Sequence, residues 1–269
     1  MSSGHAVLVR RILTVAIILP LFLAGLFWLP QPLWGATMLG VVVLACMEWG
    51  ALAALGPRAV AVFTLLVVGA CVALAWMRFP GGTWVLAVAV AFWLAVVPLW
   101  LRRVRPASPA ALVIAGAIVL ISAWYSLYVL QETASRLLAL LGVVWIADTA
   151  AYFVGRRFGR RKLAPSISPG KTWEGVLGAV AVVGVYYGLL WWLWAPAFLV
   201  GHRVADLILV AGMLALSVEG DLFESWVKRR ANVKDSGTIL PGHGGVLDRI
   251  DGLVAALPLA ALGSMIGSK

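Results

Sequence analysis

The run of residues 109–130 reads PAALVIAGAIVLISAWYSLYVL and contains no charged side chain. A helix needs about 20 apolar residues to cross the roughly 30 Å hydrocarbon core of a bilayer, so this run is long enough to span one. Its apolar character is continuous. This excludes a membrane β-barrel, because barrel strands alternate apolar and polar residues over about ten positions. Residues 109–130 therefore predict a transmembrane helix.

Comparable runs fill most of the chain. Of its 269 residues, 63% are hydrophobic and 12% are charged, whereas soluble domains average about 45–50% apolar and about 25% charged residues. These proportions exclude a water-soluble globular fold and a disordered chain. We expect an all-α, polytopic integral membrane helix bundle of about nine transmembrane helices. The apolar runs lie at 12–29, 33–55, 59–77, 83–101, 109–130, 137–155, 174–195, 204–218 and 252–267.

The basic residues indicate how the bundle is oriented. If the N-terminus is cytoplasmic, all but four of the 21 Lys and Arg residues fall on the cytoplasmic side of these spans. Such an excess is the usual mark of cytoplasmic segments. We therefore expect a cytoplasmic N-terminus and a C-terminus outside. The formal net charge of +10 then reflects topology and the anionic ligands of cytoplasmic loops, and we expect no nucleic-acid partner.

The acidic residues divide the chain into two parts. Residues 1–135 contain only two carboxylates, Glu48 and Glu132, and the other nine of the eleven Asp and Glu residues follow them. We interpret residues 1–135 as N-terminal membrane scaffold helices with five spans. Residues 136–269 would be the catalytic membrane helices, with four spans and cytoplasmic loops at 156–173 and 219–251.

Two carboxylates lie inside apolar runs. Asp148 and Glu48 each precede the end of a run by seven residues, which places them about 10 Å deep from the same face. An ionisable group at that depth costs several kcal/mol unless it faces a polar cavity or a partner. For Glu48, a buried hydrogen bond between helices and a functional role both stay open. For Asp148 we favour a function, because a strongly charged loop follows it.

That loop contains a candidate phosphate-binding segment. Gly170, Lys171 and Thr172 directly precede a predicted helix start, and they offer amide groups, a point charge and a hydroxyl. It is not a Walker A loop, because the first glycine and its spacing are missing. A positive-inside anchor with a turn at Pro169–Gly170 would explain the basic residues alone. Those residues are Arg156, Arg157, Arg160, Arg161 and Lys162.

The polar segment before the last span is more informative. Residues 225–251 read SWVKRRANVKDSGTILPGHGGVLDRID. If the preceding helix continues past Val218, then Asp221, Ser225 and Lys228 share one face. Asp248 and Asp251 share a face at the head of the last span. Carboxylates on two helices, lysines between them and a glycine-rich turn favour a site for Mg²⁺ and phosphates over a solvated loop.

The lengths of the last two spans support this interpretation. The runs 204–218 and 252–267 contain 15 and 16 residues, fewer than the roughly 20 expected for a full crossing. Their polar ends, with Asp221 and Asp248, would lie at or below the membrane surface, where irregular polar structure is tolerated only around a wet cavity. A cavity open to cytoplasm and lipid would let a soluble and a lipid substrate meet. The pattern therefore indicates a lipid-phosphate enzyme.

Residues 225–251 resemble the signature of the phosphatidate cytidylyltransferase (CDP-diacylglycerol synthase) family. The shared pattern is Ser-x-x-Lys-Arg, four residues, Lys-Asp, then Pro-x-His-Gly-Gly-x-x-Asp-Arg-x-Asp. The segment 148–175 is also similar to that family. The resemblance implies a metal-dependent nucleotidyltransferase that joins CTP to phosphatidic acid and releases pyrophosphate. It also implies a multi-pass protein of the inner (cytoplasmic) membrane with its active site on the cytoplasmic side.

The resemblance also implies roles for individual residues. Asp221 and Asp248 would hold Mg²⁺, with Asp251, Asp235 and Asp148 as further ligands or as partners of the ligands. Whether one or two divalent ions bind, and whether a monovalent cation binds with them, stays open. The catalytic set would be Asp221, Lys228, Asp248 and His243, with His243 donating to pyrophosphate or lipid phosphate. The substrate and phosphate-binding set would be Ser168, Lys171, Thr172, Ser225, Arg229, Lys234, Gly244, Gly245 and Arg249.

Other classes of protein would carry different patterns. A transporter or channel more often places its acids near mid-membrane, whereas here they gather at one face. A CDP-alcohol phosphotransferase needs an Asp-Gly…Ala-Arg…Gly…Asp…Asp pattern that we do not find, and a polyprenol kinase is the other related alternative. A binding-only role is disfavoured by the intact acids and lysines. The oligomeric state, including a homodimer, stays open.

Overall fold

The computed structural model of the chain describes residues 2–77, 81–103, 107–194, 203–239 and 244–267. It is 85% helical. The π-helical turn η1 (Phe92–Val96) joins α4 to α5, and the 3₁₀ turn η2 (Gln131–Thr133) joins α6 to α7. The α-helices are α1 (Ser2–Trp28), α2 (Gln31–Leu52), α3 (Pro57–Met77), α4 (Gly81–Ala91), α5 (Val97–Arg103), α6 (Pro109–Leu130), α7 (Ala134–Phe158), α8 (Trp173–Trp194), α9 (Arg203–Arg230) and α10 (Leu247–Gly267).

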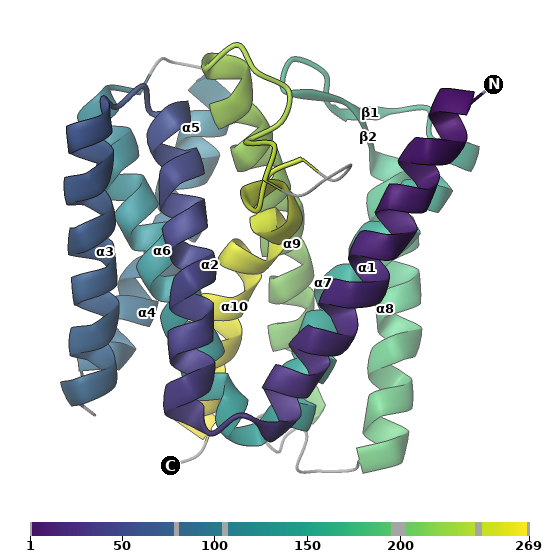
Figure 1. The fold of residues 1–269 in the computed structure, drawn as a ribbon. Coiled ribbons are helices and arrows are strands. Elements are labelled where there is room, and N and C mark those ends of the chain that lie inside the picture. Colours follow the sequence, from purple (N-terminus) through teal and green to yellow (C-terminus); the bar gives the residue numbers. More distant parts are fainter. Residues whose placement is uncertain (1, 78–80, 104–106, 195–202, 240–243, 268–269) are drawn as a thin grey trace.

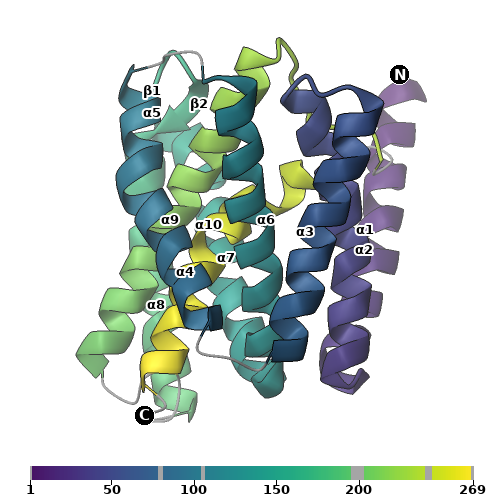
Figure 2. The ribbon, with the colours of Figure 1, turned by 90° about the vertical axis from the view of Figure 1, so that its left-hand side faces the viewer.

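The long helices stand side by side in one bundle and alternate in direction (Figures 1 and 2). The start of α1 lies at the same end of the bundle as the strands and the segment after α9, and the end of α10 lies at the opposite end (Figure 1). That the two termini face opposite sides of a membrane stays a prediction. Which end is cytoplasmic stays a prediction.

The prediction of an all-α membrane protein is confirmed in its coarse form. Six described helical stretches are long and apolar enough to cross a bilayer. One of them, Pro109–Phe158, spans 50 residues and contains both α6 and α7, and Thr14–Trp28 is a shorter apolar helix. α9 is not among the six, since acidic residues interrupt it from Asp206 to Glu224. The predicted number of spans therefore stays a prediction.

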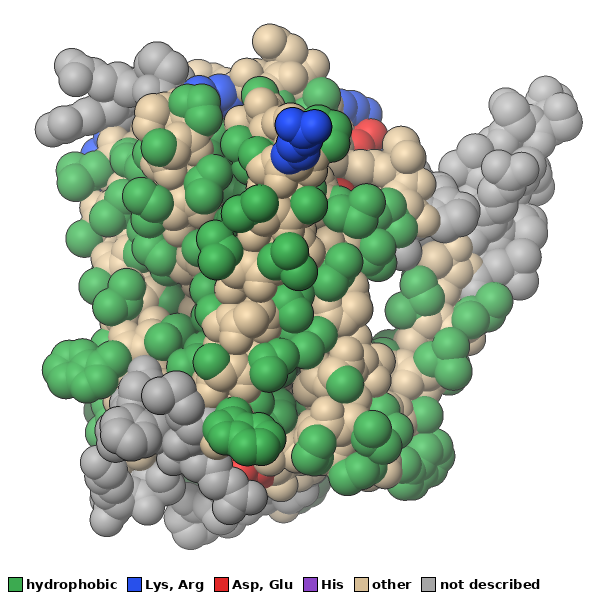
Figure 3. All heavy atoms as spheres, turned by 60° about the vertical axis from the view of Figure 1, so that its left-hand side comes forward, with side chains coloured by type: hydrophobic (Ala, Val, Ile, Leu, Met, Phe, Trp, Pro, Cys, Tyr) green, Lys and Arg blue, Asp and Glu red, His purple; other side chains and the backbone are tan. Residues whose placement is uncertain are grey.

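The outer surface of the bundle is apolar. Figure 3 shows hydrophobic side chains over most of one face, with Lys and Arg side chains toward one end. Large apolar side chains point outward from several helices: Trp76, Val185 and Trp192 are 87%, 74% and 79% exposed. Water-soluble monomers rarely expose contiguous apolar area on this scale, whereas lipid tails would cover it.

Helix α10 connects the two halves of the chain. It packs against α9, and also against α6 and α4 from the first half. Four of its alanines are fully buried, which lets neighbouring helices approach closely. On α9, a Cβ at Gly220 would overlap the carbonyl oxygen of Asp251. The predicted scaffold and catalytic parts therefore share one core, and the glycine brings Asp221 close to the start of α10.

The loop 156–173 contains a small β-hairpin that the sequence did not predict. Strand β1 (Lys162–Ala164) pairs antiparallel with β2 (Ser168–Thr172), with Lys162 opposite Thr172. The turn lies at residues 165–167, so the alternative interpretation is wrong in placing a turn at Pro169–Gly170; those residues belong to β2. The Glu174 carboxylate anchors the hairpin by accepting the backbone N–H groups of Arg160 and Arg161.

The start of α10 lies inside the bundle. Figures 1 and 2 show α10 beginning farther from the hairpin end than the point where α9 ends. That Asp221 and Asp248 lie at or below the membrane surface stays a prediction. Polar backbone at such a depth requires partners, because lipid offers none. Those partners define the candidate site.

Candidate active site

A buried lysine joins α9 to α10. The Lys228 ammonium lies 2.6 Å from Asp248 Oδ1 and 2.8 Å from Glu224 Oε2. All three side chains are at most 14% exposed. Lys228 lies beyond the apolar segment 204–218; burial alone would lower the pKa of its ammonium, but the two carboxylates raise that pKa above its ordinary value. The lysine is therefore held as a cation.

A second lysine brings the hairpin to the same helix. The Lys171 ammonium at the end of β2 lies 2.6 Å from Asp221 Oδ2, and it donates to the Val218 carbonyl at 3.4 Å. Asp221 Oδ1 accepts a hydrogen bond from Ser225 at 3.4 Å. Asp148 of α7 and Asp251 of α10 lie close enough to interact electrostatically with Asp221 and Lys171. Asp221 therefore pairs directly with the ammonium, and two further aspartates, from α7 and α10, lie within electrostatic reach of it.

Asp248 is held by the loop that precedes it. Its Oδ2 accepts the backbone N–H of Ser236 and of Gly245, both at 2.9 Å, and lies 3.1 Å from the Ser236 hydroxyl. Gly244 has φ +84°, which favours glycine, and a Cβ there would lie 2.8 Å from Asp248 Oδ2. The loop before α10 therefore closes around this carboxylate.

A cavity of about 310 Å³ opens beside these ion pairs. Every residue of its lining except Val233 belongs to the predicted site. With four cations and three carboxylates, the lining can hold a polyanion and a metal ion together. The lining residues are Ser225, Lys228, Arg229, Val233, Lys234, Asp235, Asp248, Arg249 and Asp251. The prediction that Asp221, Ser225 and Lys228 share a face of α9 agrees with the Ser225–Asp221 hydrogen bond and the place of Lys228 in this lining.

Some predicted residues have other partners in the structure. Thr172 is buried, and its hydroxyl accepts the Gly175 N–H at the start of α8, so it is a helix cap and is not open to a phosphate. The Gly245 N–H donates to Asp248 and therefore does not face a ligand in this arrangement. Ser168 lies in β2, away from the lining of the 310 Å³ cavity. His243 lies outside the described residues.

Two residues of the site were missed. Glu224 pairs with Lys228, and Ser236 contacts Asp248. The spacing of Glu224 four residues before Lys228 was an available signal, since such pairs face each other on a helix. Ser236 gave no comparable signal, because its role depends on how the loop folds back.

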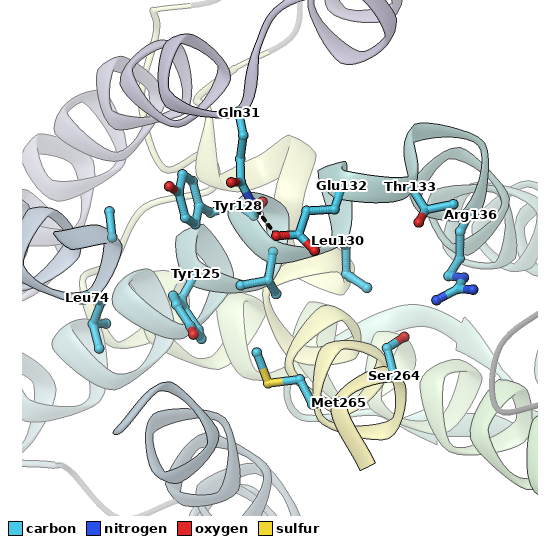
Figure 4. Close-up of a pocket in the computed structure, with 12 residues that line it drawn as sticks. Gln31, Leu74, Tyr125, Tyr128, Leu130, Glu132, Thr133, Arg136, Ser264 and Met265 are labelled. Carbon is cyan, nitrogen blue, oxygen red and sulfur yellow. Dashed lines mark hydrogen bonds between the residues drawn. The ribbon is translucent and has the colours of Figure 1, made fainter. Parts of the chain in front are cut away.

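A larger cavity, of about 510 Å³, lies at the opposite end of the bundle between η2 and the ends of α2, α3, α6, α7 and α10 (Figure 4). Gln31 donates to Glu132 at 3.2 Å within it. Its lining includes none of the predicted site residues. The smaller cavity is the candidate active site, because it alone of the two contains the clustered lysines and aspartates.

Comparison with known proteins decides the family. Residues 9–265 match the model of the family described as "Cytidylyltransferase family". The chain belongs to the cytidylyltransferase family. It is similar to proteins named phosphatidate cytidylyltransferase. The one from Pseudomonas aeruginosa is 36% identical over 266 residues, which cover 94% of this chain and 95% of that protein. Those from Haemophilus influenzae and Thermotoga maritima are 51% identical over 118 residues (43% of this chain, 41% of that protein) and 40% identical over 139 residues (47% of this chain, 48% of that protein).

The cytidylyltransferase site has donors of the right chemistry for a magnesium ion. Carboxylate oxygens are the protein ligands that Mg²⁺ prefers, and the Lys171 ammonium provides the positive charge among Asp148, Asp221 and Asp251. Glu224 Oε1 is buried with no hydrogen-bond donor among the described residues. No three His, Cys, Asp or Glu side chains in those residues converge closely enough to form a ready-made metal site. The donor set therefore fits such an ion by its chemistry, with Asp221 paired to Lys171 in this arrangement.

Proposed function

We propose that this chain is a phosphatidate cytidylyltransferase that joins CTP to phosphatidate, giving CDP-diacylglycerol and pyrophosphate. The observation that carries the proposal is the cavity between α9 and α10. It combines Lys228, Lys234 and two arginines with aspartates at one end of an apolar bundle. A lipid phosphate in the membrane and a soluble nucleotide can both reach such a place. Membership of the cytidylyltransferase family and the names of the similar proteins support the same reaction.

The reaction needs electrostatic help more than proton transfer. A phosphate oxygen of phosphatidate bonds to the α-phosphorus of CTP, and the bond from that phosphorus to the oxygen bridging to the β-phosphorus breaks. The electron pair leaves with pyrophosphate. A phosphate monoester has a second pKa of about 6, so the nucleophile is ionised at neutral pH and no proton has to be removed. The difficulty is to bring two polyanions together in line.

The cations of the lining meet that requirement. Lys228 is fixed between Glu224 and Asp248, so its ammonium is positioned before substrate arrives and costs little reorganisation. Arg229, Lys234 and Arg249 surround the same cavity and are more exposed. We assign Lys228 to the phosphates nearest the reacting phosphorus, and the exposed cations to the remaining triphosphate and lipid phosphate charges.

We infer that the enzyme uses Mg²⁺, held by Asp221 with Asp251 and Asp148. Asp248 and Asp235 line the neighbouring cavity and would complete the acidic set. When bound, the ion would neutralise charge on the nucleotide phosphates. Lys171 pairs with Asp221, and we assign its ammonium to a nucleotide phosphate when the ion is bound.

We further infer that the site faces the cytoplasm of a cell whose inner membrane holds the bundle, with the C-terminus outside. The described basic residues of the hairpin and of the end of α9 all lie at the end of the bundle that contains the site. A concentration of Lys and Arg at one end is typical of the cytoplasmic side. CTP is therefore expected to enter from that side.

Product analysis tests the proposed function. Purified protein in detergent receives CTP labelled at the α-phosphorus together with phosphatidate and Mg²⁺. We expect the label in a lipid-extractable product that depends on all three components, with pyrophosphate in equal amount. The control is Asp248→Asn, which keeps the size of the side chain and removes its charge. Label in water-soluble CMP alone, or in no product, would contradict the proposal.

A further inference from the structure

Glu48 reaches the candidate site from the first half of the chain. It lies on α2, and its side chain is buried, with 4% of the residue exposed. Its Oε1 accepts the backbone N–H of Val246 at 2.9 Å, and its Oε2 accepts that of Leu247 at 2.9 Å. These N–H groups lie at the start of α10, where a helix has no carbonyl partners of its own for them. One carboxylate therefore satisfies two of the helix's free donors.

A serine connects this carboxylate to the site. The Ser236 hydroxyl lies 3.0 Å from Glu48 Oε2 and 3.1 Å from Asp248 Oδ2, and it accepts the Asp248 N–H at 3.3 Å. Asp248 in turn holds Lys228. A continuous chain of hydrogen bonds therefore runs from α2 through the loop to the ion pair between α9 and α10.

Two glycines show how closely the loop packs on Glu48. A Cβ at Gly237 would lie 2.5 Å from Glu48 Oε1, and one at Gly245 would lie 2.6 Å from Oε2. Among the described glycines, only Gly244 has a positive φ, so Gly237 and Gly245 are needed for space and not for backbone conformation. The loop is therefore shaped around the carboxylate of another helix.

We propose that Glu48 is a positioning residue of the enzyme, a role that rests on the proposed function. Among the hydrogen bonds of the described residues, Glu48 reaches the lining of the cavity through Ser236 and the backbone before Asp248. It sets the start of α10, and through it the places of Asp248 and Lys228. This role accounts for a buried acid in a helix whose other residues are mostly apolar.

The charge and the length of the side chain both matter in this role. A carboxylate accepts hydrogen bonds at both oxygens, whereas the amide of Glu48→Gln would turn an NH₂ group toward at least one donor. A buried N–H without an acceptor is destabilising, and the loop would shift to give that N–H another partner. Glu48→Asp is one methylene shorter and would lose contact with α10 or draw the loop toward α2.

The test separates positioning from a structural hydrogen bond by its kinetic signature. We compare wild type, Glu48→Gln and Glu48→Asp in the labelled-CTP assay, and we measure kcat, both KM values and the melting temperature in detergent. Gln131→Met is the matched control, because Gln131 is also a buried polar residue of the first half that bonds helix carbonyls, at the opposite end of the bundle. We expect kcat of Glu48→Gln to fall at least about tenfold, with each KM within about threefold of wild type.

The control and a coupled variant make the outcome decisive. Gln131→Met should lower the melting temperature and keep kcat within about twofold of wild type. Gly237→Ala should lower kcat in the wild-type background. In Glu48→Ala the same change should alter kcat by less than about twofold, because the carboxylate that the new Cβ would contact is absent. This pair also serves if Glu48→Gln fails to fold.

Three results would overturn the inference by itself and leave the proposed function standing. Unchanged kcat in Glu48→Gln would show that the hydrogen bonds of Glu48 to α10 are only structural. The same conclusion would follow if kcat fell in both Gln131→Met and Glu48→Gln in proportion to the fall in melting temperature. Independent effects of Gly237→Ala and Glu48→Ala would show that the contact does not shape the site. Activity absent in the wild-type protein would instead overturn the proposed function, and this inference with it.

Discussion

Lys228 and Asp248 meet between α9 and α10 with 2.6 Å between the ammonium and a carboxylate oxygen. The two residues lie 20 positions apart, on either side of the loop that closes around Asp248. Breaking a buried ion pair leaves an uncompensated charge, which costs more than the pair contributes when intact. The arrangement of the candidate site therefore depends on both partners.

Asp248→Asn tests that dependence. The amide cannot pair with Lys228 as an anion, and its NH₂ group would face donors at Ser236 or Gly245. We expect transfer to fall by about 10²–10³-fold, the size typical for loss of one preorganised electrostatic group. Steady-state kinetics with CTP and phosphatidate measure this. Activity within about threefold of wild type would remove Asp248 from the proposed machinery.

Lys171→Gln tests whether the lysine and a metal ion share Asp221. Removing the ammonium leaves Asp221 without its ion-pair partner, so we expect a lower Mg²⁺ concentration at half-maximal activity and a lower kcat. Lys162→Gln is the control, because Lys162 is an exposed lysine of the same hairpin. A chelator should abolish transfer in all three proteins. An unchanged Mg²⁺ requirement in Lys171→Gln would contradict the proposed competition.

Gly220→Ala tests the close approach of α9 and α10. The new Cβ would overlap the Asp251 carbonyl oxygen and lie 2.9 Å from Ala255 Cβ, so we expect the free energy of unfolding to fall by about 1–3 kcal/mol. Activity should fall with it. At Gly212, on the same helix, a Cβ meets only the flexible end of Leu259. Gly212→Ala should therefore be tolerated, and equal effects of the two changes would count against this account.

Glu174→Ala tests how the hairpin holds Lys171 in place. Loss of the carboxylate frees the N–H groups of Arg160 and Arg161, so their hydrogen exchange should become faster than in wild type. We expect kcat to fall as well, because β2 positions Lys171. Unchanged exchange at these two amides would show that the hairpin is held by its other contacts.

Local patterns were sufficient to predict the helices and much of the site. The apolar run 109–130 identifies α6 because the cost of placing side chains in lipid depends on the residues themselves. The spacing of Asp221, Ser225 and Lys228 predicted a shared helix face, in agreement with their contacts and cavity lining. Such predictions hold because they depend on neighbours within a few residues.

Contacts across the chain could not be predicted in the same way. Glu48 and Val246 are 198 residues apart, and nothing near Glu48 in the sequence distinguishes a bond to α10 from a bond to another helix. The hairpin was missed because its short strands carry no alternating apolar pattern. Thr172 was expected at a phosphate, but it caps α8 and is buried against Gly155 and Gly159.

The most direct test of the central claim is the stoichiometry of the wild-type reaction. Purified protein with Mg²⁺ receives phosphatidate and, in separate samples, CTP, ATP, GTP or UTP, and pyrophosphate and nucleotide-linked lipid are measured together. The account predicts equal amounts of pyrophosphate and CDP-diacylglycerol, formed only when CTP and phosphatidate are both present. Pyrophosphate released without lipid, or inorganic phosphate released from phosphatidate, would contradict it.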